Sequence, residues 1–260
     1  MPTPPHDSAR FALYRFTRAV VSAAHAQGKE ERAAQAYFGA AVLATSDKAV
    51  ERRQERLALT DLVVGGLPLV RAALRQFNIE VPAPLDYPAV LRPWLRRELR
   101  QSTLANVLAN LEAGAEPMFV KPSVRAKRFT GFVLDDPFDY RLAGVSRREP
   151  VWVSPIVKFV SEYRYYVLDG ELRTRGVAVA GPEPDIGQVQ AAIAAYSRAG
   201  APCGFALDFG VLDTGETALV EANDAFSLGL YPEAAPHAYL EMLAARWGEL
   251  VNPALALASA

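Results

Sequence analysis

The chain has 260 residues, of which 51% are hydrophobic and 22% are charged, so it can bury a sizeable core as one large domain or two modest ones. Its formal net charge is -1 and its pI is near 6.3, which argues against a globally basic nucleic-acid binder. We therefore expect no nucleic-acid partner.

The chain contains a single cysteine, Cys203, which rules out an intramolecular disulfide framework. Its three histidines, His6, His25 and His237, lack the spacing of metal ligands, so a zinc site is not expected. The first ten residues do not have the basic-then-apolar order of a signal peptide, and the longest apolar run is too short to span a bilayer. A cytoplasmic location without a membrane partner is the expectation.

The first half of the chain has mainly helical patterns. Residues 10–44 are rich in alanine and have apolar positions at helical spacing, which predicts that residues 1–60 form a helical N-terminal extension. Residues 61–81 have the order strand, Gly-Gly turn, helix and second strand. A further helix is predicted from Pro93 to Gly114, which makes residues 61–117 an α/β region.

From Met118 onward the pattern changes to strands, so a domain boundary is expected near residues 114–118. The predicted strands are MFVKP, RFTGFVL, VWVSPIVKF, EYRYYVL and ELRTRGVAVA. A helix follows at about residues 185–199, then a second hairpin, then a last helix at about residues 236–250. These elements predict an α+β fold.

The second hairpin carries acids on one face. Two β-prone runs, FALDFGVL and TALVEAN, flank the turn Asp213–Glu216, and a two-residue turn at its centre pairs Asp208 with Glu221. Opposed like charges are destabilising unless a cation compensates them, and Asn223 shares the face of Glu221. Oxygen ligands of this kind suit Mg²⁺. The alternative is a solvated hairpin whose two acids face water.

The first hairpin carries arginines. EYRYYVL and ELRTRGV are joined by Asp169-Gly170, and this register places Arg164 opposite Arg175, with Arg173 on the same face. Guanidinium groups match phosphate and carboxylate geometry, so the three arginines predict an anion site. Glu162 lies on this face too, which leaves an internal Glu/Arg salt-bridge network as the alternative.

A second cluster of basic residues precedes both hairpins. Lys121 ends a short apolar strand and is followed by Pro122 and by a loop that contains Lys127 and Gly131. A lysine in this position can hold a phosphate as a point charge, although most loop lysines are simply solvated. Lysines, arginines and metal-type oxygens together match what nucleoside triphosphate chemistry requires.

These motifs resemble the ATP-grasp superfamily, and specifically an uncharacterised clade named for two arginines and a lysine. The resemblance is carried by FVKP with FTG, by SEYRYYV, and by LDFGV followed by LVEANDAFSLGLY, and it covers about residues 61–245. It implies two α+β subdomains around a nucleotide cleft, with residues 61–117 as a pre-grasp-like region and residues 118–250 as the nucleotide-binding region.

The resemblance also implies roles for individual residues. Lys121 is expected to contact phosphate, while Asp208, Glu221 and Asn223 are expected to hold Mg²⁺, with Mn²⁺ as the alternative ion. Arg164, Arg173 and Arg175 are the catalytic candidates. The remaining nucleotide-binding candidates are Lys127, Gly131, Trp152, Val153, Ser154, Ile156 and Glu162. Two departures stand out: a glycine-rich loop reduced to Gly131, and Ser154-Pro155 in the hinge where many relatives carry acidic or amide side chains.

The expected activity is ATP- and Mg²⁺-dependent ligation of a carboxylate to an amine or thiol through an acyl phosphate. The substrates are expected to be small molecules, peptides or proteins, and the sequence assigns neither them nor an oligomeric state. Ser227 and Tyr231, just beyond the metal set, are candidate substrate contacts. Two alternatives stay open: an ATP-binding sensing or interaction module without ligase activity, and a kinase-like phosphotransferase.

Overall fold

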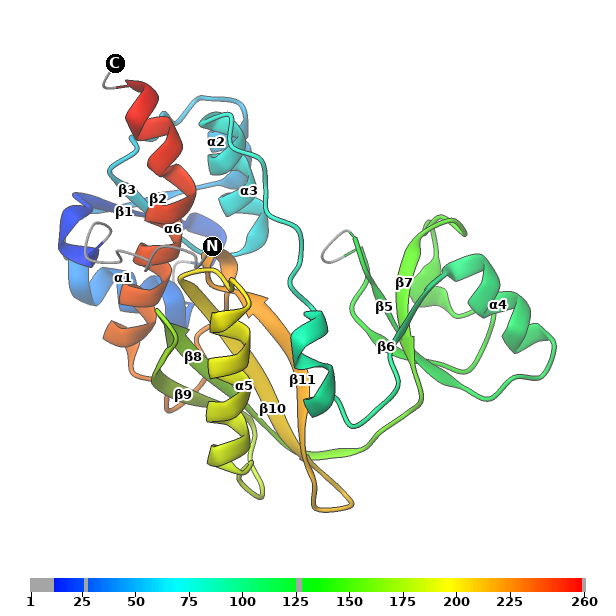
Figure 1. The fold of residues 1–260 in the computed structure, drawn as a ribbon. Coiled ribbons are helices and arrows are strands. Elements are labelled where there is room, and N and C mark those ends of the chain that lie inside the picture. Colours follow the sequence, from blue (N-terminus) through cyan, green and yellow to red (C-terminus); the bar gives the residue numbers. More distant parts are fainter. Residues whose placement is uncertain (1–11, 26–27, 125–127, 259–260) are drawn as a thin grey trace.

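The computed structural model describes residues 12–25, 28–124 and 128–258, which form three sheets and six α-helices within these ranges (Figure 1). The helices are α1 (Lys29–Phe38), α2 (Asp47–Glu51), α3 (Leu67–Gln76), α4 (Leu104–Glu112), α5 (Ile186–Arg198) and α6 (Pro236–Ala258). The strands are β1 (Arg18–Ser22), β2 (Val42–Thr45), β3 (Asp61–Val64), β4 (Arg100–Thr103), β5 (Met118–Pro122), β6 (Phe132–Leu134), β7 (Pro150–Ser154), β8 (Phe159–Leu168), β9 (Glu171–Val179), β10 (Gly204–Leu212) and β11 (Thr217–Asp224). Short 3-10 turns η4 (Ala89–Trp94) and η6 (Ala225–Ser227) border the site.

The N-terminal sheet is parallel, with strand order β2-β1-β3. The prediction of a helical extension over residues 1–60 is therefore wrong for β1 and β2. Ala19, Val20 and Val21 are buried in succession, as expected for a parallel strand covered on both faces, and such a run looks like a helix segment when only its apolar content is considered. The predicted division at residues 60 and 61 also separates β1 and β2 from β3, although all three belong to one sheet.

The prediction for residues 61–81 is right in its first part only. β3, the Gly-Gly turn and α3 are present, but residues 79–81 do not form the second strand. The parallel neighbour of β3 is β1, which precedes it in the chain, so β3 needs no partner after α3. Residues 79–88 instead form an extended connection that reaches η4.

The central sheet is antiparallel, with strand order β11-β10-β8-β9. One face packs against α5, whose N-terminus is capped by Asp185 through bonds from the backbone N–H groups of Gly187 and Gln188. The other face shares its core with α6 and the N-terminal sheet, where Trp247 is fully buried and donates to the carbonyl of Asp61 at 2.9 Å.

The small lobe, residues 100–154, contains an antiparallel sheet with strand order β4-β7-β5-β6 and helix α4. A single helix from Pro93 to Gly114 was predicted and is wrong, because residues 100–103 pair with β7 as strand β4 and α4 begins only after Thr103. The boundary predicted near residues 114–118 is wrong for the same reason, since β4 and β5 lie in one sheet.

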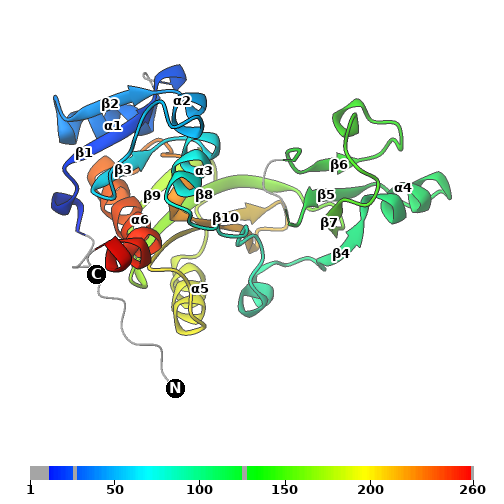
Figure 2. The same ribbon diagram turned by 90° about the horizontal axis from the view of Figure 1, so that it is seen from above.

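The small lobe lies to one side of the rest of the molecule, as both ribbon views show (Figures 1 and 2). The chain enters it after η4 and leaves it between β7 and β8, so two segments connect it to the central sheet. Within the described ranges, no helix has both the length and the apolar character needed to cross a lipid bilayer.

Candidate functional site

Asp208 of β10 lies opposite Glu221 of β11, as predicted, but the turn does not have the predicted form. The backbone N–H of Gly215 bonds the carbonyl of Leu212 at 2.8 Å, and Val211 pairs with Thr217, which shifts the register near the turn by one residue. A β-bulge next to Asp208 inserts one extra residue, Val220, into β11 and restores the predicted pairing.

Arg97 stabilises this bulge. Its guanidinium donates to the carbonyl of Leu219 at 2.8 Å and to the carbonyl of Val220 at 2.9 Å. A bulge leaves backbone groups without ladder partners, and the fork of an arginine can satisfy two carbonyls together. Arg97 lies within the helix predicted from Pro93 to Gly114, and its contact with the bulge was not predicted from the sequence.

Asp208 is 1% exposed and forms a bidentate ion pair with Arg164 of β8. The two bonds join Nε to Oδ1 at 2.7 Å and Nη2 to Oδ2 at 2.6 Å, while the Asn223 amide donates to Oδ2 at 3.0 Å. Burial raises the pKa of Asp208, and Arg164 opposes that shift. The Arg164 guanidinium also lies 4.1 Å from the centroid of the Tyr231 ring.

The predicted convergence of Arg164, Arg173 and Arg175 is wrong. A bulge between Tyr166 and Val167 on β8 makes Arg173 an extra residue on β9, so Arg164 lies opposite Gly176 rather than Arg175. Arg173 contacts Glu241 of α6 at 3.2 Å, whereas Arg175 contacts Glu183 at 2.8 Å. Of the three, only Arg164 lies beside the acids of the hairpin.

Lys121 of the small lobe contacts two carboxylates at once. Its Nζ lies 2.5 Å from Glu221 Oε2 and 2.5 Å from Asp86 Oδ1, and 5.4 Å from the centroid of the Tyr87 ring. Burial would lower the pKa of Lys121, but the charge of Glu221, the Tyr87 phenol and Asp86 raise it above the ordinary value. The same lysine holds the pKa of Glu221 below its ordinary value against the opposing effect of burial.

Asp86 was not predicted from the sequence. Its backbone carbonyl accepts from the N–H of Ala222 at 2.8 Å, and its φ of 45° lies in the left-handed region that aspartate tolerates better than most residues. Its side chain is 8% exposed, and burial raises its pKa. No local pattern around a single aspartate in a Pro-rich stretch signals such a contact.

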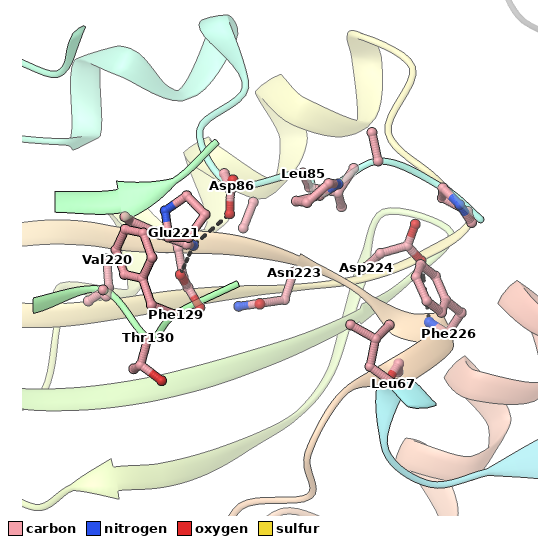
Figure 3. A pocket seen from close by; sticks show the side chains of 18 of the residues that line it. Leu67, Leu85, Asp86, Phe129, Thr130, Val220, Glu221, Asn223, Asp224 and Phe226 are labelled. Carbon is pink, nitrogen blue, oxygen red and sulfur yellow. Dashed lines mark hydrogen bonds and ion pairs between the residues drawn. The ribbon is translucent and has the colours of Figure 1, made fainter. Parts of the chain in front are cut away.

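A cavity of about 560 Å³ lies between the small lobe, the central sheet and the connection after α3. In Figure 3, Phe129, Thr130 and Val220 lie at one end, Leu67, Leu85 and Phe226 lie at the other, and the dashed lines mark the contacts at Asp86 and Glu221. The sequence-predicted residues that line it are Lys121, Gly131, Glu162, Glu221, Asn223 and Ser227. Neither Asp208, Arg164 nor Tyr231 is part of its lining.

Close packing leaves no room for a side chain at position 131, so this position requires glycine. A Cβ at this position would lie 2.7 Å from the Phe119 ring and 3.3 Å from Cβ of Lys121, so a side chain would push against the strand that carries the lysine. Lys127, the other loop residue predicted to contact phosphate, lies outside the described residues.

A second cavity of about 240 Å³ adjoins the first and shares Phe119, Val220 and Glu221 with it. The hinge residues Ser154 and Ile156 line it, together with Arg97 and Tyr87. The other two hinge candidates do not: Val153 is buried in the small-lobe core, and the Trp152 ring packs edge-on against Tyr87 at 5.5 Å between centroids.

The side-chain oxygens of Asp208, Glu221 and Asn223 can bind a hard cation only together with ligands from outside the protein. Among the described residues, no group of three or more His, Cys, Asp and Glu side chains is arranged to hold a metal ion. The predicted set has two carboxylates and one amide, and Asp208 and Glu221 already accept bonds from Arg164 and Lys121. A carboxylate oxygen has two lone pairs, so these oxygens can contribute to a Mg²⁺ whose remaining ligands are phosphate and water.

Glu162 gives a pH-dependent prediction. Burial and the negative charges of Asp208 and Glu221 raise its pKa from 4.5 to about 7. Because the pKa of this carboxyl is higher in the folded protein than in the unfolded chain, its contribution to stability is complete below the pKa of the unfolded chain. That contribution is lost as the pH rises through the pKa of the folded protein. In EDTA, the Glu162→Gln variant is therefore expected to gain about 1–2 kcal/mol over wild type between pH 5 and pH 8, after a discount for partial solvent exposure.

Urea unfolding at both pH values measures this difference. The control is Glu171→Gln, whose side chain is 78% exposed and which should show no pH-dependent gain. Equal behaviour of the two variants would contradict the assigned environment of Glu162.

A comparison with protein-family models decides the family. Residues 94–242, more than half of the chain, match the model of an ATP-grasp domain, the second family of the clade named for two arginines and a lysine. The chain belongs to this ATP-grasp family. The match runs from the last residue of η4 to the first part of α6 and includes every predicted site residue, so the two lobes around the cavity are those of an ATP-grasp fold.

Solved structures with ATP-grasp folds are similar to the chain at low sequence identity. A RimK-domain ATP-grasp protein from Sphaerobacter thermophilus is 15% identical, with 87% of this chain and 98% of that chain covered and a TM-score of 0.49. The D-alanine–D-alanine ligase from Bacillus anthracis, complexed with ATP, is 14% identical, with 94% and 99% covered and a TM-score of 0.48.

The ATP-grasp ligase PsnB, complexed with a minimal precursor, is 16% identical, with 52% of this chain and 48% of that chain covered and a TM-score of 0.37. This chain thus matches about half the length of PsnB. A search of curated proteins found no match.

Proposed function

We propose that the protein is an ATP- and Mg²⁺-dependent ligase that joins a carboxylate to an amine or thiol. The observation that carries this proposal is the contact between Lys121 and Glu221, which join the two lobes of an ATP-grasp fold in the lining of the cavity between them. This contact places an ammonium group that can bind phosphate beside a carboxylate that can bind a metal ion, at one end of a cavity that has room for a second substrate.

The residues can be assigned to parts of the nucleotide. The adenine is proposed to occupy the smaller cavity beside Ser154 and Ile156, with the triphosphate extending toward Lys121 and Gly131. Asp208, Glu221 and Asn223 would hold Mg²⁺, which neutralises the negative charge of the phosphates. Arg164 would act by orienting Asp208, since it contacts that carboxylate and does not line the cavity.

The proposed reaction has two steps. A carboxylate oxygen attacks the γ-phosphorus, the bond between the γ-phosphorus and the bridging oxygen breaks, and ADP leaves. The amine nitrogen or thiolate then attacks the acyl carbon, the bond from that carbon to the phosphate oxygen breaks, and inorganic phosphate leaves; the amine or thiol also loses a proton.

The metal assignment is tested by Glu221→Gln, with Glu216→Gln as the control because Glu216 lies in the exposed turn of the same hairpin. Loss of one carboxylate ligand is expected to weaken Mn²⁺ binding at least tenfold, on the order of the effects seen when metal-site residues are changed. Binding is measured by electron paramagnetic resonance of Mn²⁺ with a non-hydrolysable ATP analogue. Glu216→Gln should bind Mn²⁺ as wild type does, and the same result for Glu221→Gln would refute the site.

Product analysis separates ligation from the alternatives. A ligase releases ADP and phosphate only when a carboxylate and a nucleophile are both present. Phosphorylated product without phosphate release would identify a phosphotransferase, and tight nucleotide binding without turnover of any substrate pool would identify a sensing or interaction module.

A further inference from the structure

We infer that the nucleophile is an amine that enters as its ammonium ion, and that Glu162 of β8 is the residue that binds it in the larger cavity. This inference rests on the proposed ligase function and chooses between the amine and the thiol that this function leaves open. It also assigns Glu162 to the nucleophile rather than to the nucleotide.

Most of the acidic side chains that line the larger cavity already have partners. Asp86 and Glu221 both contact Lys121, which is part of the same lining. Asp224 accepts bonds of 2.8 and 2.7 Å from Arg246 of α6. These carboxylates are therefore occupied by cations of the chain itself.

Glu162 also lines the cavity, but its carboxylate forms no hydrogen bond or ion pair with any residue in the described part of the chain. The residues opposite it in the central sheet are Gly210 on β10 and Val179 on β9. Cross-strand neighbours are the usual partners of a strand side chain, and neither of these two has a polar side chain. The carboxylate of Glu162 is therefore available to a group that enters the cavity.

The place of Glu162 in the sheet is close to the proposed metal ligands. Glu162 precedes Arg164 by two residues on β8, so the two side chains share one face of the sheet. Asp208 lies opposite Arg164, and Glu221 lies opposite Asp208. Two residues span roughly 7 Å of a strand, so a ligand of Glu162 would lie next to the phosphate that these groups are proposed to bind. The acyl phosphate is attacked at this place.

The cation that Glu162 binds could be a metal ion or an ammonium group, and the geometry favours ammonium. Within the ranges that the structure describes, no three His, Cys, Asp or Glu side chains are arranged around a metal site, so Glu162 does not complete one with Asp208 and Glu221. An ammonium group needs only a single carboxylate as a charge-assisted acceptor. A thiolate is an anion, and the same three carboxylates would repel it.

Glu162 also destabilises the folded protein when it is ionised. Burial and the charges of Asp208 and Glu221 raise its pKa to about 7, and Arg164, which opposes this shift, is already paired with Asp208. A charged residue that lowers stability and has no internal partner is typical of a functional site. An incoming ammonium group would supply the missing partner.

The proposed step is balanced without a further reactant. The bound ammonium group loses one proton to solvent, and the amine nitrogen attacks the acyl carbon of the acyl phosphate. The bond from that carbon to the phosphate oxygen breaks, and the second proton leaves with inorganic phosphate. Glu162 holds the nitrogen in place by accepting a hydrogen bond from it.

Three nucleophiles of different charge test the inference at pH 8. Hydroxylamine is uncharged at this pH, ethylamine is mainly an ammonium ion, and ethanethiol is partly a thiolate. A pool of monocarboxylic acids, dicarboxylic acids and N-acetylated dipeptides is first screened with ATP, Mg²⁺ and hydroxylamine for an acid that forms a hydroxamate. That acid is then used with each nucleophile, and the amide or thioester is quantified by mass spectrometry.

The wild-type protein is expected to use ethylamine with a kcat/KM about tenfold above that for ethanethiol. Glu162→Gln keeps the size of the side chain but removes its charge. The ratio of kcat/KM for ethylamine to that for hydroxylamine should therefore fall about tenfold, the effect of losing one charge-assisted hydrogen bond, mainly through a higher KM for ethylamine.

Two further variants control for charge and location. Glu162→Asp keeps the carboxylate and should retain most of the wild-type ratio. Glu171→Gln removes a charge from the same hairpin at a side chain that is 78% exposed, and it should leave the ratio unchanged. The Kd of the ATP analogue reports whether each variant is folded.

The outcomes separate this inference from the function on which it rests. A wild-type preference for ethanethiol, or the same ratio in Glu162→Gln and wild type, overturns the inference and leaves the ligase function intact. Loss of a bound Mn²⁺ from Glu162→Gln in the paramagnetic resonance titration also overturns it, because Glu162 would then be a metal ligand. Absence of hydroxamate with every acid, while the ATP analogue still binds, overturns the ligase function and the inference with it.

Discussion

Replacing Arg164 by methionine is expected to destabilise the protein by about 3–5 kcal/mol, the range for removing one partner of a buried ion pair. The side chains of Arg164 and Asp208 are 7% and 1% exposed, so neither water nor salt can replace the lost guanidinium. At about 2–4 °C per kcal/mol for a chain of this size, Tm should fall by roughly 6–20 °C.

The destabilisation should depend on pH. Without Arg164, burial is the dominant effect on Asp208, so its pKa rises further and the protonated form becomes the favoured one. The stability gap between Arg164→Met and wild type should therefore narrow as the pH is lowered, because protonation removes the unpaired charge. Thermal unfolding of both proteins at pH 5 and pH 8 measures this narrowing.

Arg173 and Arg175 provide matched controls from the same hairpin. Each side chain is 37% exposed and its ion pairs lie at the surface, so Arg173→Met and Arg175→Met should each cost no more than about 1 kcal/mol. A double variant, Arg164→Met with Asp208→Leu, should recover much of the loss, since an apolar pair replaces the ionic one. Three arginine variants with equal effects would contradict the separation of these residues in the structure.

The two hairpins show what pairing rules can and cannot predict. The positions of both turns and of all four strands could be predicted from local sequence, because turn residues and β-prone runs are local signals. The register could not, because each hairpin contains a bulge. The bulge at Val220 restored the predicted pairing of Asp208 with Glu221, whereas the bulge at Arg173 removed Arg175 from the face of Arg164.

Bulges depend on contacts that lie far away in the chain. The bulge in β11 leaves the carbonyls of Leu219 and Val220 to Arg97, which lies more than 120 residues earlier and on the entry to the small lobe. No window of sequence around either strand contains this information. Asp208, Glu221 and Asn223 could be predicted to lie together because they belong to one hairpin, whereas Asp86 was missed because its contact with Lys121 joins distant parts of the chain.

The N-terminal region was mispredicted for a related reason. A parallel strand that is buried on both faces shows no alternation of apolar and polar residues, so the alanine-rich sequence around β1 predicts a helix instead. The predicted helix from Pro93 to Gly114 includes the residues of β4, because the partner strand that makes them a strand, β7, follows nearly fifty residues later. In both cases tertiary pairing overrides local propensity.

Lys121→Met and Asp86→Asn are expected to change nucleotide affinity in opposite directions. Lys121 is 20% exposed and lies between two carboxylates, so it must release at least one of them to contact a phosphate. Loss of the lysine removes the attraction for phosphate and leaves Asp86 and Glu221 facing it, and the affinity for a non-hydrolysable ATP analogue should fall at least tenfold. Turnover should fall by about 100-fold or more, as for other groups that stabilise the transferred phosphoryl group.

Loss of the Asp86 charge should instead raise the affinity for the ATP analogue. The asparagine in Asp86→Asn keeps the size of the side chain and tolerates the φ of 45°, so the backbone contact with Ala222 should persist. It would no longer compete with phosphate for Lys121 or repel the nucleotide, so the Mg²⁺-free affinity for the analogue should rise about tenfold, equivalent to roughly 1.4 kcal/mol.

Isothermal titration of the analogue in EDTA measures both changes, with Lys158→Met as the control for a general loss of positive charge near the cavities. Lys158 is exposed on the segment between β7 and β8, so its replacement should shift the affinity by less than about threefold, the range for a screened surface charge. A lysine that served only to hold the two lobes together would weaken binding in both variants, whereas tighter binding by Asp86→Asn is expected when the carboxylate of Asp86 no longer competes with phosphate for Lys121 or repels the nucleotide. If Asp86→Asn bound the analogue more weakly, or if Lys121→Met bound it as wild type does, Lys121 would not leave its carboxylate partners to contact phosphate.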